Sequence, residues 1–317
     1  MFAVTQIAGT LADANGLGEI AMTLLLFLPL WWGWVGVTLL GNAEGAALDT
    51  ARGRLILFVL AGCGLSMAIA IPQAYADRGL LFAGGYCALR LLLWVVRHGQ
   101  AGFREIRVEP FAVSLFVAGP LFVLGALAPT EVRVAVWTVA VVIEMLTPAV
   151  LTREARFETT HLPERFGLFL IIALGETVVA VGANATTISL GPATAGALVL
   201  CFAIMTLLWW SYFHYGAPAA RHSLSTDPVQ ARIARDVFSY AHLVYVIAII
   251  CIAVGMKKAL LHPLDVPHSL TELMLAPGVG LYLAGFCYSR QRMFGGIGLP
   301  RFLGAVACVV LAPLASV

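Results

Sequence analysis

The sequence predicts an all-helical protein that crosses a membrane many times. Of its 317 residues, 61% are hydrophobic and 11% are charged, and the mean hydropathy is +0.93. Soluble globular domains are less apolar and carry about twice that share of charge. The apolar residues fall in runs of roughly 20, the length that a helix needs to cross a bilayer. The formal charge of +2 and the lack of long like-charge blocks argue against a nucleic-acid partner.

Ten apolar segments are long enough to span the membrane. They cover approximately residues 17–40, 53–73, 79–97, 110–128, 131–151, 163–184, 193–215, 236–257, 269–289 and 300–317. Before them, residues 1–12 are apolar over about half the spanning length. This stretch resembles the end of a truncated first span. The alternative is a signal peptide, but a signal peptide would begin with a positively charged region, which these residues lack. We therefore expect about 10 to 11 spans in a single transmembrane domain, residues 1–317.

The basic residues concentrate in alternate loops between these segments. Of the 19 Lys and Arg residues, 14 belong to one set of loops: Arg52, Arg54, Arg97, Arg104, Arg107, Arg153, Arg156, Arg165, Arg221, Arg232, Arg235, Arg290, Arg292 and Arg301. The other loops contain only Arg78, Arg133, Lys257 and Lys258. Because basic loops stay on the cytoplasmic side, we expect a bacterial inner-membrane protein, surrounded by lipids, whose N-terminus is cytoplasmic.

Two aromatic stretches suggest an internal repeat. PLWWGWVG at 29–36 is similar to LLWWSYF at 207–213, and each belongs to a span predicted to start in the cytoplasm. A parallel repeat with halves 1–150 and 151–317 would explain the similarity. Aromatic belts at the membrane surface would explain it equally well. The sequence leaves both interpretations open, and it is also compatible with a homo-oligomer.

Five polar residues lie inside the predicted spans: Arg90, Glu144, Glu176, His214 and His242. Counted from the nearest cytoplasmic arginine, they lie roughly 10 to 16 Å deep. Charged groups at such depth usually face the protein interior and are paired. We expect Arg90 to pair with one of the two glutamates. Burial then favours the protonated form of the other, which becomes the candidate proton carrier or general acid.

The segment HLPERFGLFLIIALGE, residues 161–176, predicts a polar path along one helix. Arg165 and Glu176 are 11 residues apart, close to three turns, so both lie on one stripe with His161. The alternative is structural, since Glu164 suits a helix N-terminus and Arg165 suits a membrane edge. The residues that we assign to substrate binding are Arg90, His161, Glu164, Arg165, His214 and His242.

No sequence motif indicates a metal or a cofactor. The six cysteines lie in apolar segments without a C-x-x-C pair. The chain also lacks H-E-x-x-H, G-x-S-x-G and Walker motifs. We therefore predict neither a metal site nor a cofactor.

The run from His161 to Glu176 resembles the signature of the bacterial low-temperature-requirement A family of polytopic membrane proteins. Further matches are FAVTQ at 2–6, LWWGWVG at 30–36, MAIAIPQA at 67–74, LLWWSYF at 207–213 and YAHLVYVIAIICIAVG at 240–255. The resemblance implies a membrane protein in which Glu164, Arg165 and Glu176 are important. Two features depart from the family pattern. An acidic, aromatic stretch usually precedes FAVTQ, and an aspartate usually stands near His214.

Three functional hypotheses follow. Buried carboxyl groups and a polar path favour a transporter or permease that is coupled to protons or moves a small solute. A buried Glu144 or Glu176 could instead act as general acid in an intramembrane enzyme with a lipophilic, for example prenylated, substrate. The third alternative is a non-catalytic membrane or stress protein. The sequence does not decide whether the protein is an enzyme.

Overall fold

A computed structural model describes residues 1–43, 50–99, 109–151, 157–312 and 314. Within these ranges the chain forms helices and turns and contains no β-strand. Eight of the described helices are long and apolar enough to cross a membrane: Leu17–Asn42, Ala51–Gln73, Gly79–Gly99, Pro110–Leu127, Thr130–Leu151, His161–Ala185, Pro192–Thr226 and Gln230–Leu261. The prediction of an all-helical, multi-pass membrane protein is confirmed at this level.

The last two predicted spans are not among these eight helices. Residues 269–289 fall largely in α14, Leu275–Phe294, and residues 300–317 begin with α15, Leu299–Leu311. At 13 residues, α15 is about 20 Å long and shorter than the hydrocarbon core. The predicted first stub corresponds to the 11-residue apolar helix α1, Phe2–Ala12. The larger count of 10 to 11 spans stays a prediction.

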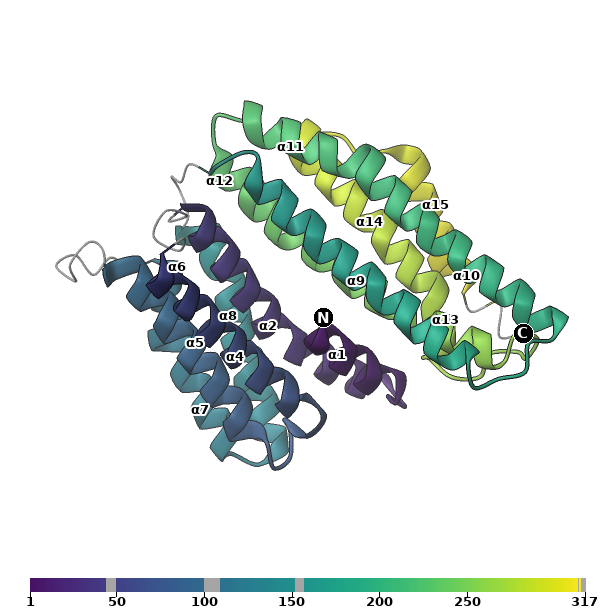
Figure 1. Cartoon of the computed structure of the whole chain (residues 1–317), viewed down its shortest axis with the longest axis horizontal. Coiled ribbons are helices and arrows are strands. Elements are labelled where there is room, and N and C mark those ends of the chain that lie inside the picture. The colour runs from purple at the N-terminus through teal and green to yellow at the C-terminus, as the bar shows by residue number, and fades with distance from the viewer. Residues whose placement is uncertain (44–49, 100–108, 152–156, 313, 315–317) are drawn as a thin grey trace. The chain divides into compact units, whose positions relative to one another are not determined.

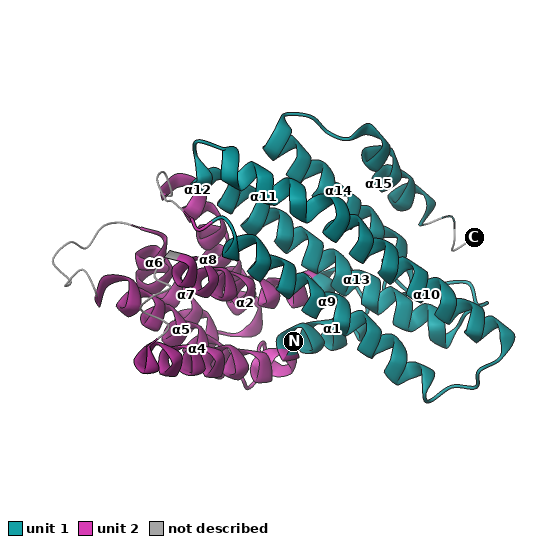
Figure 2. Ribbon diagram, turned by 45° about the horizontal axis from the view of Figure 1, so that its top comes forward, with its two compact units in different colours: residues 1, 3–20, 159–317 teal, residues 2, 21–158 magenta. Residues whose placement is uncertain are grey.

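The chain divides into two compact units (Figure 2). The N-terminal unit comprises residues 2 and 21–158, and the C-terminal unit comprises residues 1, 3–20 and 159–317. The division after residue 158 lies close to the predicted boundary of the repeat halves. Residues 3–20, with most of α1, belong to the C-terminal unit although they begin the chain. The repeat itself stays a prediction.

The N-terminal unit is a bundle around an aromatic core. Its elements are α2 (Leu17–Ala43, which begins in the other unit), α4 (Ala51–Ala70), η1 (Ile71–Gln73), α5 (Gly79–Gly99), α6 (Pro110–Val113), η2 (Ser114–Ala118), α7 (Gly119–Leu127) and α8 (Thr130–Leu151). Helix α5 packs against both α4 and α7 (Figure 1). The Tyr86 and Phe122 ring centroids are 4.3 Å apart, and the indole of Trp137 donates to the Phe122 carbonyl over 2.9 Å.

Arg133 connects the ends of two helices in this unit. Its guanidinium donates to the carbonyls of Ala74 and Ala76, just after η1, and to those of Gly125, Ala126 and Ala128, at the end of α7. Carbonyls at a helix end lose the partners that the next turn would provide, although Gly125 O also accepts from the Ala128 N–H. The sequence analysis placed Arg133 in a loop, whereas the structure places it, buried, in the first turn of α8.

The C-terminal unit is built around α13, His242–Leu261. The other elements are α1, α9 (His161–Ala185), α10 (Pro192–Trp210), η3 (Ser211–Gly216), α11 (Ala217–Thr226), α12 (Gln230–Ile233), η4 (Ala234–Ala241), η5 (Glu272–Met274), α14 and α15. Helix α13 packs against α9 and α14 (Figure 1). A Cβ atom on Gly255 would lie 2.4 Å from the Leu275 backbone nitrogen, so the glycine permits this close helix packing.

Three described stretches are π-helical, with hydrogen bonds that span five residues: η2, η3 and η4. Each continues directly into α-helix, so residues 192–226 and 230–261 form two long, unbroken helices. A π-helical turn adds a residue to the helix and turns the following side chains, and such turns often mark functional sites. In the C-terminal unit both π-helical stretches border the same cavity.

Candidate functional site

The intramembrane arginine of the N-terminal unit is paired with Glu144. An Arg90 guanidinium nitrogen lies 2.6 Å from Glu144 Oε1, and both residues are 3% exposed. Arg90 also donates to the Trp32 carbonyl over 3.3 Å, and its Cζ lies 5.1 Å from the Tyr86 ring centroid. Neither carboxylate oxygen of Glu144 has hydrogen-bond geometry with a described residue. The contact is therefore a close charge pair.

Glu176, in the C-terminal unit, has a different environment. Its side chain is buried, with 4% of the residue exposed, and the Thr5 hydroxyl donates to Oε2 over 2.6 Å. Across the described part of the chain, no Lys, Arg or His side chain forms an ion pair with Glu176. One buried acid thus has a guanidinium partner, and the other has a neutral hydroxyl.

A tyrosine and a histidine form a buried pair in the same unit. The Tyr212 hydroxyl oxygen lies 2.6 Å from His242 Nε2, and His242 Nδ1 lies 2.9 Å from the Val237 carbonyl oxygen. Because a carbonyl only accepts, Nδ1 of His242 donates. In the neutral ring Nε2 then accepts a hydrogen bond from the Tyr212 hydroxyl. A hydroxyl group, a base beside it and a third group that orients the base are the parts of an activated nucleophile.

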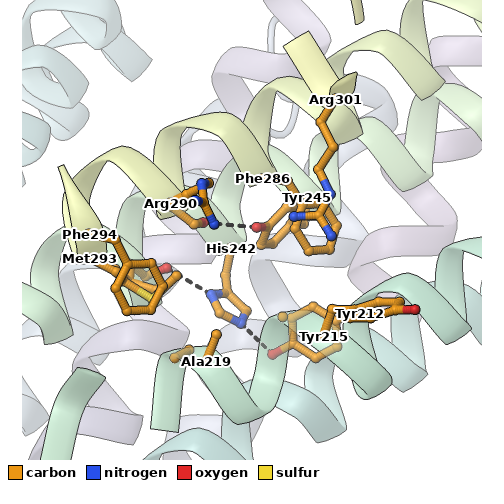
Figure 3. A pocket seen from close by; sticks show the side chains of 14 residues that line it. Tyr212, Tyr215, Ala219, His242, Tyr245, Phe286, Arg290, Met293, Phe294 and Arg301 are labelled. Atoms are coloured by element: carbon orange, nitrogen blue, oxygen red, sulfur yellow. Dashed lines mark hydrogen bonds between the residues drawn. The ribbon is translucent and has the colours of Figure 1, made fainter. Parts of the chain in front are cut away.

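The pair lines a cavity of about 260 Å³ (Figure 3). Its walls combine aromatic rings with a few polar groups: Tyr212, Tyr215, Gly216, Ala219, Ala220, Val237, His242, Tyr245, Phe286, Ser289, Arg290, Met293, Phe294 and Arg301. The Tyr245 hydroxyl and Ser289 Oγ are 2.8 Å apart. An apolar wall with a small number of placed polar groups is typical of a small-molecule site.

The π-helical stretches position both members of the pair. Tyr212 lies in η3, and His242 directly follows η4. The bond from His242 to Val237 reaches back five residues, which is the π-helical spacing. On the opposite side, the Phe166 ring of α9 meets the imidazole edge-on, with centroids 5.1 Å apart. His242 is thus held by three separate segments of the C-terminal unit.

The polar residues at the start of α9, His161, Glu164 and Arg165, are exposed. His161 Nδ1 lies 3.4 Å from Glu164 Oε2, and an Arg221 nitrogen lies 3.7 Å from Glu164 Oε1. Such exposed ion pairs contribute little to stability. Glu164 lines an open groove of about 750 Å³ with Gly167, Leu168, Ile171, Phe213, Arg221 and His222 among other residues. Arg165 is exposed and does not line this groove.

The structure brings only some of the candidate residues together. Glu176 follows Phe166 by ten residues on α9, or about 15 Å along the helix axis, while His242 lies beside Phe166. The two groups are therefore in separate places. His214 is exposed, stacks on Trp210 with centroids 5.1 Å apart and does not line the cavity. Glu144 and Glu176 line neither of these two hollows.

The sequence analysis missed Asp236. This residue is buried, receives a bond from Arg235 Nε over 2.6 Å and a second from Arg292 Nε over 2.7 Å. It thereby ties η4 to α14. Asp236 is the first residue of a predicted span, where acidic residues are common. Its position alone therefore did not predict a buried ion pair. The nearby arginines, Arg235 and Arg292, were the available hint.

No metal-binding cluster occurs among the residues that are described here, since nowhere do three His, Cys, Asp or Glu side chains come together. A tyrosine hydroxyl is held against a histidine nitrogen, and two arginines stand at the same cavity.

Comparisons with known proteins give one family. The family model described as bacterial low temperature requirement A protein matches residues 1–317. An uncharacterized protein from Rhizobium meliloti (strain 1021) is 33% identical over 310 residues, which covers 92% of this chain and 74% of that protein. No solved structure matches.

Proposed function

This chain belongs to the bacterial low temperature requirement A family, and we propose that it is a permease that moves protons, both alone and together with a small solute. In this proposal Glu176 carries the proton. Glu144 acts as the fixed counter-ion of Arg90. The proposal thus gives the two buried acids different roles.

The observation that carries this proposal is the difference between the partners of the two acids. Glu144 lies 2.6 Å from a guanidinium, so its carboxylate has a positively charged partner. Glu176 contacts a threonine hydroxyl, which can donate to a carboxylate or accept from a carboxylic acid. The neutral hydroxyl is therefore compatible with both protonation states. Intramembrane acids of this kind are common in proton pathways.

The helical organisation supports the same proposal. The chain forms two compact units of helices that are suited to a membrane, and many secondary transporters are built from two such units. In the C-terminal unit α9 has Glu164 at an open groove near one end and the buried Glu176 three turns further along. A solute-binding surface and a proton carrier could thus share one helix.

We expect Glu176→Gln to remove proton movement, because glutamine cannot bind and release a proton. The purified protein is placed in liposomes that contain a pH-sensitive dye, and a potassium diffusion potential is imposed with valinomycin. The wild-type protein should change the internal pH faster than protein-free liposomes, and the variant should match the protein-free rate. Glu131→Gln, which neutralises an exposed acid at the start of α8, should keep the wild-type rate.

Two results would contradict the proposal: a wild-type rate equal to that of protein-free liposomes, and an unchanged rate in Glu176→Gln. Either result would favour the alternative of a non-catalytic membrane or stress protein if, in addition, cells with Glu176→Gln show the same phenotype as cells with the wild-type protein. Thermal unfolding in detergent shows whether the variant is folded, so a lost rate can be assigned to the proton step.

The intramembrane-enzyme alternative has one observation in its favour, the Tyr212–His242 pair at the wall of a cavity. In that alternative Tyr212 would be the general acid, in place of the glutamate expected from the sequence, because neither buried glutamate lines the cavity. Membranes containing the protein, incubated with prenylated lipids, should then yield a new product by mass spectrometry that Tyr212→Phe abolishes. A product-free wild-type reaction would count against this alternative.

A further inference from the structure

Four arginines of the C-terminal unit, one from η4 and three from α14 and α15, divide into two pairs. Arg235 and Arg292 both form an ion pair with the single buried carboxylate of Asp236. Arg290 and Arg301 both line the 260 Å³ cavity. Among the described residues neither of these two forms an ion pair with a carboxylate, and no acidic residue lines the cavity. The cavity therefore has two positive charges that the protein does not balance.

The guanidinium of Arg301 is held in place by aromatic rings. Its Cζ lies 4.8 Å from the Phe286 ring centroid and 5.9 Å from that of Tyr215. Such stacking fixes the plane of a guanidinium and leaves its N–H groups free to bind an anion. Figure 3 shows Arg290 and Arg301 together with the tyrosine and histidine side chains of this cavity.

We infer that this cavity binds a phosphate monoester carried on a small apolar body. Two guanidinium groups, the ring-stacked one of Arg301 and the exposed one of Arg290, match a dianion, and a phosphate monoester has a charge of about −1.5 to −2 at neutral pH. A single carboxylate would leave one guanidinium unbalanced. The aromatic walls, with Tyr212, Tyr245 and Phe286, would receive the apolar body. The inference concerns binding and is independent of the proton proposal for Glu176.

The ligand could be a soluble organic phosphate or the headgroup of a lipid such as phosphatidic acid. Both contain the same phosphate monoester. By the distribution of basic residues, the loops that contain Arg290 and Arg301 are predicted to be cytoplasmic, and either source is available there. The experiment below separates the two sources.

Phenyl phosphate is the probe, and its binding is measured by calorimetry on the full chain in phosphatidylcholine nanodiscs. We expect saturable binding that is tighter than that of benzoate or benzyl alcohol. Arg290→Gln and Arg301→Gln should each weaken it by roughly 10-fold, the loss typical of a charge-assisted hydrogen bond. Lys257→Gln removes a positive charge near the far end of α13 and should bind like the wild type. Unchanged thermal unfolding shows that each variant is folded.

The same titration in nanodiscs that contain phosphatidic acid identifies the source. Loss of phenyl phosphate binding there would support the inference with the lipid as ligand, and unchanged binding would support it with a soluble ligand. Three results would overturn it: no saturable binding in phosphatidylcholine, equal binding of benzoate or benzyl alcohol, or equal binding by the two arginine variants and the wild type.

Discussion

Arg90→Gln should destabilise the protein by about 3–5 kcal/mol, because it leaves the charge of Glu144 buried without a partner. Both residues are 3% exposed, so water cannot replace the guanidinium. Glutamine is too short and neutral to balance the carboxylate. Thermal and chemical unfolding in detergent should show the loss as a lower midpoint. Arg54→Gln, at an exposed arginine in the first turn of α4, is the control and should unfold like the wild type.

The double variant Arg90→Met with Glu144→Leu separates structure from function. Replacing both members of a buried pair by apolar residues is often neutral or stabilising, so most of the lost stability should return. If Glu144 is only a counter-ion, the double variant should also keep the wild-type rate of proton movement. A stable double variant that has lost that rate would give Glu144 or Arg90 a direct part in transport.

Arg133→Gln is the second change that should have a large effect, and we expect a loss of at least about 3 kcal/mol. The guanidinium donates to five carbonyls at the ends of η1 and α7. Three of these hydrogen bonds, to Ala74, Gly125 and Ala126, are buried, and a buried carbonyl left unsatisfied costs about 1–3 kcal/mol. Arg133→Lys should recover part of the stability, since an ammonium keeps the charge but cannot reach both helix ends with a rigid fork.

The measurement for Arg133 is again unfolding in detergent, with Glu131→Gln as the control on the same helix turn. Proton movement in liposomes should persist in whatever fraction of Arg133→Gln remains folded, because Arg133 lies in the other unit from Glu176. An unfolding midpoint equal to that of the control would show that water satisfies these carbonyls and that Arg133 has no stabilising role.

Several segments that carry the family resemblance and lie far apart in the sequence meet in the C-terminal unit. Thr5 of the FAVTQ segment donates to Glu176 of the 161–176 segment. Tyr212 of LLWWSYF bonds to His242 of the 240–255 segment, and Phe166 packs on the same imidazole. The resemblance pointed to these segments without saying how they are joined. Their hydrogen bonds now give each segment a physical role in one of two sites.

Some site predictions used only the depth of a residue in the membrane, and depth alone did not predict which residues contact one another. Arg90, Glu144, Glu176, His214 and His242 all lie inside predicted spans. The structure pairs the first two, buries Glu176 beside Thr5, joins His242 to Tyr212 and leaves His214 exposed. Counting residues from a membrane edge gives the height of a side chain. It does not give the direction in which that side chain points around the helix.

By itself, the sequence determined the membrane class, most of the long helices, the family and the small set of polar groups that such helices must bury. The membrane class, the helices and the polar groups follow from composition and hydropathy, which are local, and the family follows from the resemblance of the quoted motifs. Only the tertiary structure decided that Glu144 rather than Glu176 pairs with Arg90, that Arg133 caps two helix ends, and that Tyr212 and His242 share a cavity with two unbalanced arginines. Ion pairs and hydrogen bonds form over about 3 Å. They therefore depend on how helices distant in sequence are rotated and packed, and hydropathy contains no record of that.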